Sequence, residues 1–447
     1  MKIAFATTCR DRAYHLQETL PKNLADISGY SDSVIVVLDY NDSGDVSKFV
    51  QDHHAKDLDS GRLVYYRTDE PPKFHMAHAK NMAHRCALME EADVLVNLDA
   101  DNFTGYDFAQ YVADKFVMAV EDREPIFLGT RGNHRGPGDL VSVRTPPGCF
   151  GRIGVTRDAF RHAGGYDEIF SDWSPDDKDF GNRLKWLGYN WRQIRPVFLD
   201  AIRHGNPLRH KDYVAVNEVN ILKARQNLGV VNAGQIGTGI VRRNFSSEAI
   251  EIRSIPTRVF GIGLHKTGTT SLHRAFQIMG LDSAHWASPH WSKYIWDEMH
   301  EHGRSRTLEM HYALSDLPIP LLYQKLDIAY PGSKFVLTIR DEDEWIASIK
   351  THWHLRKSWD NDVFSNIAHY ELYGTTEFDE AVFRARYRRH NDDVRSYFAA
   401  RPNALLVLDL SQAKMRDLCR FLDVPVIAGT FPHSHKSSDQ PKYQGFN

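Results

Sequence analysis

The first half of the chain alternates short apolar stretches with amphipathic ones. Five stretches rich in valine, isoleucine and leucine are bounded by turn residues and predict β-strands at 2–8, 33–39, 62–68, 93–99 and 125–131. Apolar spacing typical of helices lies between them, at 15–24 and 77–91. Strands that alternate with helices predict an α/β fold with a largely parallel sheet.

A second α/β pattern begins near residue 257, with strands expected at 259–263, 334–340 and 404–410. A helix is expected at 212–227, and a glycine-containing segment without strong periodicity follows it. We therefore predict two α/β domains. They are a nucleotide-binding domain at 1–228 and a second domain with a parallel sheet at 257–447, joined by a connector at 229–256 with room for one strand.

Charge and composition exclude several classes of protein. Lys and Arg number 55 and Asp and Glu 58, a net charge of -3 that argues against a general nucleic-acid-binding protein. No apolar run is long enough to span a membrane, and the apolar N-terminal stretch is too short for a secretory signal. Scattered cysteines at 9, 86, 149 and 419 predict neither a disulfide framework nor structural zinc. We expect a soluble protein of the cytoplasm, and peripheral membrane association stays open.

An acidic motif ends the strand expected at 93–99. Asp99 and Asp101 are two positions apart, so both carboxylates can converge on one hard cation such as Mn²⁺ or Mg²⁺. Open α/β sheets bind ligands at this end of their strands. A solvated turn is the alternative, because this spacing is common.

Two later segments give the motif a context. Gly164 and Gly165 are followed by Trp173 and then by the carboxylate pair Asp176 and Asp177, which can supply a sugar-stacking face and a general base. In this order the three motifs resemble the nucleotide-diphospho-sugar glycosyltransferases of the GT-A (Rossmann-like) fold, in family 2 and the related galactosyltransferase group. The resemblance covers about residues 1–215. It implies a UDP-sugar donor.

The resemblance also implies roles for individual residues. Contacts to the nucleotide are implied for Thr7, Thr8, Arg10, Arg12, Asp39, Lys80 and Asn81. Asp101 and Asp99 would bind the metal, with Asp99 also reaching the ribose, and Asp177 would be the base. Asp176 stands where the family usually has Glu, so it stays open which carboxylate contacts the acceptor. His204, 27 residues after Asp177, would be a third metal ligand, with His210 in reserve and a loop histidine as the alternative.

The chemistry agrees with these roles. A sugar hydroxyl has a pKa far above 7, so a carboxylate has to accept its proton as the new glycosidic bond forms. A cation stabilises the charge of the departing UDP. One base and no second nucleophilic carboxylate predict a single displacement with inversion.

The second half carries a glycine- and threonine-rich loop between a strand and a helix, at 260–276. Backbone N–H groups at a helix N-terminus hold phosphate or sulfate oxygens, and Lys266 adds a charge. Lys266 precedes Gly268, so this is not the Walker pattern, in which Lys follows the last Gly. A glycine-rich loop that arose by chance is the alternative.

This loop resembles the 5'-phosphosulfate-binding loop of PAPS-dependent sulfotransferases, and residues 257–438 share the family's order of motifs. Arg340 at a strand end and Ser348 eight residues later match its 3'-phosphate site. The resemblance implies that Lys266 stabilises the leaving 3'-phosphoadenosine 5'-phosphate. The 5'-phosphate would be held by Thr267, Gly268, Thr269, Thr270 and Ser271. Sulfuryl transfer can then proceed without Mg²⁺, unlike P-loop phosphoryl transfer.

The base of this second site stays open between His285 and Asp316, with His285 slightly preferred. His352 and His354 are either acceptor contacts or part of a solvated helix face, and Lys436 could close over the cofactor.

We interpret the chain as a fusion of an inverting glycosyltransferase and a sulfotransferase that act in sequence on a carbohydrate or glycolipid acceptor. Linking the two sites would raise the effective concentration of the intermediate, and the product would be a sulfated surface glycan or glycolipid. Two rivals remain: a P-loop phosphotransferase in the second half, or one half that only binds a glycan.

Overall fold

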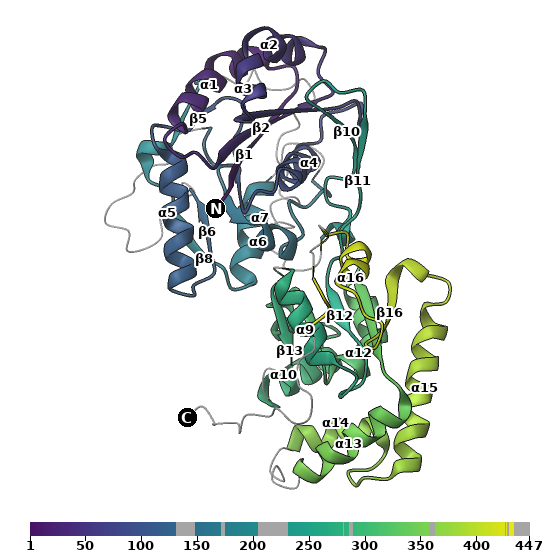
Figure 1. The fold of residues 1–447 in the computed structure, drawn as a ribbon. Coiled ribbons are helices and arrows are strands. Elements are labelled where there is room, and N and C mark those ends of the chain that lie inside the picture. The colour runs from purple at the N-terminus through teal and green to yellow at the C-terminus, as the bar shows by residue number, and fades with distance from the viewer. Residues whose placement is uncertain are drawn as a thin grey trace, which may run out of the picture. The chain divides into compact units, whose positions relative to one another are not determined.

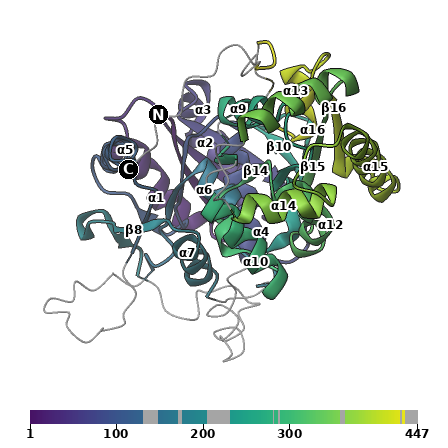
Figure 2. The same cartoon turned by 90° about the horizontal axis from the view of Figure 1, so that it is seen from below.

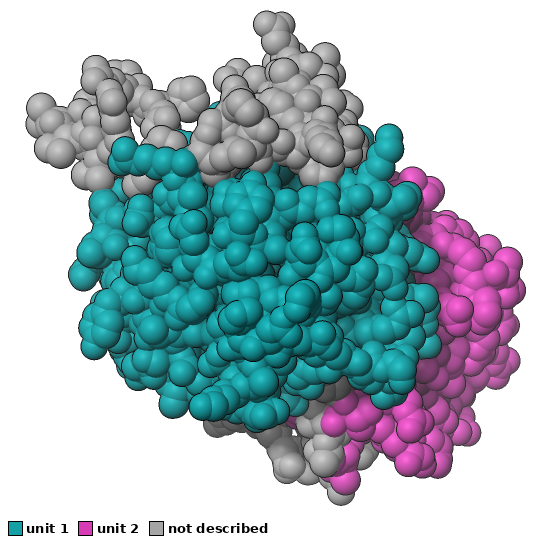
Figure 3. Space-filling model, turned by 90° about the horizontal axis from the view of Figure 1, so that it is seen from above, with its two compact units in different colours: residues 1–254 teal, residues 255–447 magenta. Residues whose placement is uncertain are grey.

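The computed structural model describes residues 1–130, 148–170, 175–203, 231–279, 281–285, 289–356, 363–424, 426 and 429–432. The chain divides into two compact units, 1–254 and 255–447, which Figure 3 shows in teal and magenta. Each unit has its own sheet and its own hydrophobic core. The prediction of two α/β domains is thus confirmed at the level of fold class.

Nine strands form the sheet of the first unit within the described residues, in the order β11-β10-β3-β2-β1-β4-β7-β6-β8. The four central strands β3, β2, β1 and β4 run parallel, but β7 is antiparallel to β4 and β6, and β10 is antiparallel to β3. The sheet is therefore mixed, and the expected parallel arrangement holds for its centre. The strands are β1 (Ile3–Cys9), β2 (Ser33–Tyr40), β3 (Leu63–Thr68), β4 (Val94–Asn97), β6 (Ile126–Gly129), β7 (Gly154–Thr156), β8 (Asn190–Gln193), β10 (Gly239–Arg243) and β11 (Ala249–Ile252).

Helices cover both faces of this sheet (Figure 1). In β1, Ile3 and Phe5 point to the face that α1 and α5 cover, whereas Ala4 and Ala6 alternate to the other face, where their small size lets α4 lie close. The elements outside the sheet are α1 (Ala13–Asp26), α2 (Asp45–His53), α3 (Ala55–Asp59), α4 (Met76–Met89), α5 (Phe108–Glu121), α6 (Arg157–His162), α7 (Asp176–Trp186), η1 (Pro196–Phe198), η3 (Asn232–Gly234) and the short pair β5 (Asn102–Phe103) and β9 (Asp200–Ala201).

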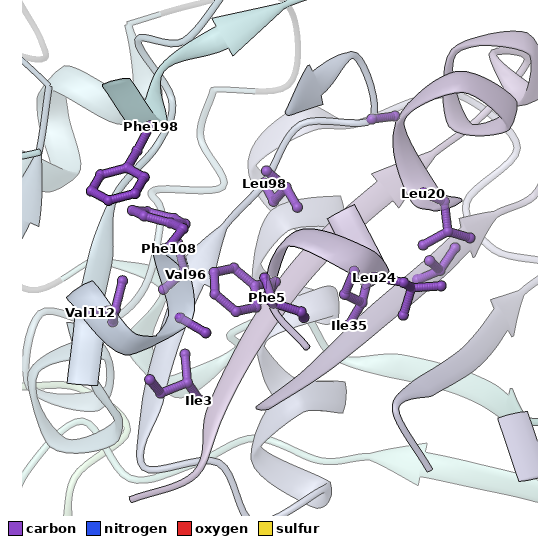
Figure 4. Packing of buried hydrophobic residues seen from close by; sticks show 14 of the residues in the cluster. Ile3, Phe5, Leu20, Leu24, Ile35, Val96, Leu98, Phe108, Val112 and Phe198 are labelled. Atoms are coloured by element: carbon purple, nitrogen blue, oxygen red, sulfur yellow. The ribbon is translucent and has the colours of Figure 1, made fainter. Parts of the chain in front are cut away.

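Aromatic and branched side chains fill the core under α1 and α5 (Figure 4). The Phe108 ring lies 5.7 Å from Phe5 and 5.1 Å from Phe198, measured between ring centroids. All three side chains are buried. This packing fixes the central strands, whose carboxyl ends carry the acidic residues of the first candidate site.

The segment predicted as a connector, 229–256, belongs largely to the first sheet. It forms two strands rather than one, because β10 pairs with β3 and β11 pairs with β10. Arg85 of α4 also holds it, donating hydrogen bonds to the carbonyl oxygens of Ile236 (3.0 Å) and Arg253 (2.8 Å). Pairing with a strand far away in sequence leaves no local signal, so the pattern alone did not predict it. The helix expected at 212–227 lies outside the described residues.

The sheet of the second unit is parallel throughout, in the order β13-β14-β12-β15-β16. Helices α9 and α16 cover one face through Leu272 and Leu418, and α12 and α15 cover the other, where Phe335 packs against Phe398 at 4.7 Å (Figures 1 and 2). The strands are β12 (Val259–Gly261), β13 (Ser283–His285), β14 (Ala313–Ser315), β15 (Lys334–Ile339) and β16 (Leu405–Asp409). The helices are α9 (Thr269–Ile278), α10 (Pro289–Glu301), α11 (Arg306–Glu309), α12 (Ile319–Ala329), α13 (Glu342–Arg356), α14 (Val363–Tyr373), α15 (Glu380–Phe398), η4 (Pro402–Ala404) and α16 (Met415–Phe421).

Two expectations from composition concern the whole chain. All four cysteines are buried and form no disulfide. No helix in the described parts of the chain is long and apolar enough to cross a membrane.

Candidate active sites

The first candidate site lies at the carboxyl end of β4. The strand ends at Asn97, two residues before Asp99, so the acidic motif occupies the turn that follows. The Asn97 amide donates hydrogen bonds to Asp99 Oδ1 (3.1 Å) and to the Gly151 carbonyl oxygen (2.9 Å). Asn97 thereby fixes the Asp99 carboxylate against the segment that precedes β7.

A buried lysine joins this site to α7. Lys80 of α4 places Nζ 2.7 Å from Asp176 Oδ2 and 2.6 Å from Asp177 Oδ1, at the start of α7. Burial disfavours the charged lysine, but the two carboxylates outweigh it and raise the Lys80 pKa well above its ordinary value. Burial, followed by the negative charge of Asp177, raises the pKa of Asp176 to about 7.

Asp99 and Asp177 converge on Gly151. A Cβ added to Gly151 would lie 3.0 Å from Oδ2 of each of them, so glycine leaves room for both carboxylates. Burial raises the Asp99 pKa to about 6, and the charges of Asp177 and Asp101 add to this effect while Lys80 opposes it. The sequence prediction placed Asp99 and Asp177 in one site, and the structure brings them together.

Asp101 is buried beside Asp99, and its Oδ1 accepts a hydrogen bond from the Asn102 amide at 2.8 Å. Among the residues that the structure describes, no three histidine, cysteine or acidic side chains are arranged to hold a metal ion. The third ligand expected from the sequence, His204, lies outside the described residues, as do His210 and Trp173.

Most residues expected to contact the nucleotide lie in or just after β1 and at the end of β2, whereas Lys80 and Asn81 lie on α4. Thr7 is buried within β1, and the Arg10 guanidinium donates a hydrogen bond to the Pro72 carbonyl oxygen at 2.7 Å. Asp39 is fully buried, and its oxygens accept hydrogen bonds from the Tyr65 hydroxyl (2.5 Å), the Arg67 guanidinium (2.9 Å) and the Asp42 backbone N–H (3.0 Å). These three contacts fix the Asp39 carboxylate at the end of β2, and its contact with a nucleotide stays a prediction.

The second candidate site is the loop between β12 and α9. Two residues in it have left-handed backbone, Lys266 (φ 66°) and Gly268 (φ 92°). A Cβ on Gly268 would lie 1.8 Å from Leu410 Cδ1, and one on Gly263 would lie 2.0 Å from Thr338 Oγ1. Both glycines are therefore required for the close approach of the loop to its neighbours.

The loop leads directly into α9, which begins at Thr269 and presents its first backbone N–H groups there. Thr270 and Ser271 follow in the first turn, as the sequence predicted. Thr267 differs, because its hydroxyl donates to the Leu264 carbonyl oxygen (2.5 Å) and contacts Thr338 Oγ1 (2.7 Å). The Thr267 side chain is fully buried, and its backbone N–H also donates to the Leu264 carbonyl oxygen at 3.2 Å, so both Thr267 donors are already engaged within the protein.

Two cationic side chains, of Lys266 and Arg340, lie near enough to interact electrostatically. Burial, and to a lesser extent the charge of Arg340, lowers the Lys266 pKa, while Asp316 opposes the shift. Arg340 follows β15, and its guanidinium pairs with Glu344 at 2.9 Å. Ser348 is half-buried on α13, two turns after Arg340.

His285 and Asp316, which the sequence left as alternative bases, contact each other. His285 Nε2 lies 3.2 Å from Asp316 Oδ2, and it also lies 3.0 Å from the Thr269 hydroxyl and 3.4 Å from that of Thr270. Burial acts to raise the Asp316 pKa, but the hydrogen bond and charge of His285, together with His265, outweigh it and hold the pKa well below its usual range.

Two residues of the first site were not predicted from the sequence, and some residues predicted for the second site lie outside the described part of the chain. Gly151 and Asn97 of the first site were not predicted from the sequence, although the polar Asn97 at the end of an apolar strand was a usable signal. His352 is half-buried on α13 near the ring of His265, at 5.9 Å between centroids. The side chain of His354, and Lys436 as a whole, lie outside the described part of the chain.

Comparison with protein families identifies the second unit. Residues 258–440 match the family model described as "Sulfotransferase domain". The second unit is therefore a sulfotransferase domain, which confirms the resemblance expected for residues 257–438. No curated protein is significantly similar to the chain in sequence.

Three solved structures with some likeness to the chain follow. The mannosyltransferase PcManGT from Pyrobaculum calidifontis, in complex with GDP-Man and Mn²⁺, is 16% identical, with 46% of this chain and 58% of that chain covered and a TM-score of 0.35. The catalytic domain of Drosophila β1,4-galactosyltransferase 7, in complex with xylobiose, is 16% identical, with 50% and 79% covered and a TM-score of 0.33. TarS of S. aureus is 13% identical, with 43% and 35% covered and a TM-score of 0.31. At such TM-scores these likenesses carry no argument, and the interpretation of the first unit rests on its own residues.

Proposed function

We propose that the second unit transfers the sulfuryl group of PAPS to a carbohydrate hydroxyl. The observation that carries this proposal is the position of Lys266 and the first turn of α9 beside Arg340, at the carboxyl end of a parallel sheet. Backbone N–H groups of that turn hold the 5'-phosphate, and Arg340 with Ser348 holds the 3'-phosphate.

In the transfer step the acceptor oxygen bonds to sulfur as the bond from sulfur to the bridging phosphate oxygen breaks. The electron pair of that bond stays on the leaving 5'-phosphate, and Lys266 stabilises the charge that develops there. The acceptor proton goes to a base at the same end of the sheet.

We assign that base to His285, with Asp316 as its positioning residue. Asp316 contacts Nε2, and Nδ1 has no hydrogen-bond partner among the described residues, so Nδ1 is the nitrogen that accepts the proton. The low pKa of Asp316 keeps it ionised, so that it stabilises the imidazolium formed in the step.

For the first unit we propose inverting transfer of a sugar from a UDP-sugar. The observation that carries this proposal is the convergence of Asp99 and Asp177 on Gly151. Lys80 holds Oδ1 of Asp177, while Oδ2 lies on the Gly151 side. Asp177 accepts the proton of the acceptor hydroxyl. At the same time the acceptor oxygen bonds to the anomeric carbon, and the bond from that carbon to the diphosphate breaks.

Asp99 and Asp101 are hard oxygen donors that fit Mn²⁺ or Mg²⁺. A cation bound there would offset the charge of the departing diphosphate. Since the described residues supply no third protein ligand, the remaining positions fall to donor phosphates, water or residues such as His204.

Joined in one chain, the two proposed reactions suit sequential work on a carbohydrate or glycolipid acceptor, one adding a sugar and the other sulfating it or its neighbour. We place this work in the cytoplasm, because the four cysteines form no disulfide and a reducing compartment keeps thiols free.

The test is a donor screen with the full chain. It is incubated with a panel of UDP-sugars, PAPS and oligosaccharide acceptors, and release of UDP and of 3'-phosphoadenosine 5'-phosphate is measured with and without EDTA. We expect UDP release to need the metal and sulfuryl transfer to persist without it. If ATP binds the second unit better than PAPS, and only with Mg²⁺, a phosphotransferase replaces the sulfotransferase proposal.

A further inference from the structure

Lys266 is held in a backbone conformation that it would not adopt unaided. Its φ of 66° lies in the left-handed region, where non-glycine residues persist only if their surroundings impose it. The residue before it, His265, provides that restraint. Trp345 Nε1 donates a hydrogen bond to the His265 carbonyl oxygen at 3.1 Å, and both residues are buried.

The His265 ring is anchored as well. Its Nε2 lies 3.3 Å from the Tyr373 hydroxyl, and the ring stacks near Trp353 at 6.1 Å between centroids. Burial lowers the His265 pKa well below its usual value, and the neighbouring histidines lower it further. A neutral, buried ring on one side of Lys266 and the buried hydroxyl of Thr267 on the other leave the loop little freedom.

Trp345 also connects the loop to Arg340 and Ser348, the residues proposed to hold the 3'-phosphate. It lies on α13, the helix that carries Ser348, and its ring stacks on Tyr387 of α15 at 4.4 Å with an interplanar angle of 20°. The Tyr387 hydroxyl accepts a hydrogen bond from the Arg340 backbone N–H (2.9 Å) and donates one to the Arg340 carbonyl oxygen (2.6 Å). One hydroxyl thus fixes the backbone of Arg340 on both sides.

These contacts form an unbroken path from Arg340 through Tyr387, Trp345 and His265 to Lys266. We propose that Trp345 and Tyr387 are positioning residues that set Lys266 at a fixed separation from Arg340. The two cations then match a nucleotide with phosphates at both its 5' and 3' positions. This inference rests on the function proposed for the second unit.

A merely structural role for Trp345 makes a different prediction. If Trp345 only filled the core, removing its N–H would lower stability and weaken ligand binding whether or not Lys266 is present. If it acts through Lys266, its effect on binding vanishes once the Lys266 side chain is removed, because the positioned group is gone.

The experiment is a double-mutant cycle on the full chain. Calorimetry measures binding of 3'-phosphoadenosine 5'-phosphate and of adenosine 5'-phosphate to the wild type, Trp345→Phe, Lys266→Ala and the double variant. Trp296→Phe is the control, since Trp296 of α10 is a partly buried tryptophan whose ring contacts those of His300 (4.3 Å between centroids) and Phe364 (6.4 Å).

We expect Trp345→Phe to weaken binding of 3'-phosphoadenosine 5'-phosphate about tenfold, the effect of one lost hydrogen bond. Trp296→Phe should change it by less than about twofold, as should Trp345→Phe in the Lys266→Ala background. An equal loss with and without Lys266, or an equal loss from Trp296→Phe, overturns the inference while leaving the proposed function intact. Failure of the wild type to bind the ligand overturns both.

Tyr387→Phe gives a second arm that does not depend on the folding of Trp345→Phe. It keeps the ring that stacks on Trp345 and removes the hydroxyl that holds Arg340. We expect the preference for 3'-phosphoadenosine 5'-phosphate over adenosine 5'-phosphate to fall about tenfold. An unchanged preference in this variant, with normal thermal unfolding, overturns the role assigned to Tyr387.

Discussion

The two candidate sites occupy the same place in their sheets and use opposite charge. In the first unit three carboxylates, of Asp99, Asp176 and Asp177, gather around the buried ammonium of Lys80. In the second unit the end of the sheet presents backbone N–H groups with Lys266 and Arg340. The carboxyl ends of parallel strands are a general location for ligands. The charge of the residues placed there decides which ligands can bind and whether they need a cation.

The difference concerns the way each site would balance the charge of its proposed donor. A carboxylate-rich site repels a diphosphate unless a cation mediates between them. A site of N–H groups and side-chain cations needs no mediator, and the nearby carboxylates of Asp316 and Glu344 are engaged by His285 and Arg340. We therefore expect the activity of the first site to require a metal ion and the activity of the second site to proceed without one.

The most severe test removes a proposed metal ligand. Asp101→Ala should abolish metal-dependent sugar transfer, because one oxygen donor to the cation is lost. Sulfuryl transfer by the same chain is the internal control and should be unchanged. UDP release is measured with added Mn²⁺ and with EDTA. Sugar transfer that continues in EDTA would show that the carboxylate cluster needs no cation and would remove the contrast between the sites.

The corresponding change in the second unit is Lys266→Ala. Losing one preorganised contact to the leaving phosphate should slow sulfuryl transfer by about 10²–10³-fold. Sugar transfer should keep its wild-type rate. The control is Lys293→Ala, which removes an exposed lysine paired with Asp297 on α10. Release of 3'-phosphoadenosine 5'-phosphate is the measurement, and a loss below about threefold would contradict the role of Lys266.

Asp177→Asn tests the base of the first unit. It keeps the shape of the side chain but removes the proton acceptor, so sugar transfer should fall by at least about 10²-fold. UDP-sugar binding, measured by calorimetry, should change little. Asp176→Asn is the matched neighbour. If that variant loses activity while Asp177→Asn retains it, the base is Asp176.

Arg340→Ala should have a smaller effect, confined to binding. A charge-assisted hydrogen bond to the 3'-phosphate typically contributes about 1.5–3 kcal/mol, so affinity for 3'-phosphoadenosine 5'-phosphate should fall about 10- to 100-fold. Affinity for adenosine 5'-phosphate should stay unchanged. Calorimetry with both ligands makes the measurement, and an equal loss for both would place Arg340 outside a 3'-phosphate site.

The smallest effect concerns stability and pH. Because the folded pKa of Asp176 is raised to about 7, the protonated carboxyl is favoured in the fold. Its contribution to stability is present at low pH and is lost as the pH rises from about 4 to 7. Urea unfolding of the first unit should therefore depend less on pH, between 5 and 8, in Asp176→Asn than in the wild type.

The control for that measurement is Asp52→Asn. Asp52 is exposed on α2 and pairs with Lys48, and its lowered pKa keeps it ionised across the whole range. Asp52→Asn should leave the pH dependence of urea unfolding as it is in the wild type. The same pH dependence in Asp176→Asn and the wild type would contradict the raised pKa of Asp176.

Local sequence predicted the parts of the molecule that local physics decides. The central strands follow their apolar runs within a few residues, and the loop before α9 follows from its glycines and threonines. Asp99 and Asp101 fall after β4, as expected for polar residues that end an apolar strand. Each of these features depends on neighbours a few positions away.

Contacts set by topology could not be predicted in the same way. Lys80 reaches Asp176 and Asp177 across almost a hundred residues, and only the arrangement of α4 and α7 brings them together. His285 and Asp316 are likewise distant in sequence, but β13 pairs with β14 so that His285 lies opposite Ser315, which places Asp316 next to it. Two rival candidates in the sequence thus become partners through strand register.

The pairing of β10 and β11 with β3 decides where the chain can be divided. A cut at residue 228, where sequence pattern alone puts the end of the first domain, would strip two strands from the sheet and leave the hydrogen-bonding edge of β3 open. Such bare edges promote aggregation between molecules. A cut after Ser254 leaves both strands in the first unit, and it also keeps the hydrogen bonds from Arg85 to Ile236 and Arg253. Separate assay of the two activities therefore depends on a boundary that only strand pairing reveals.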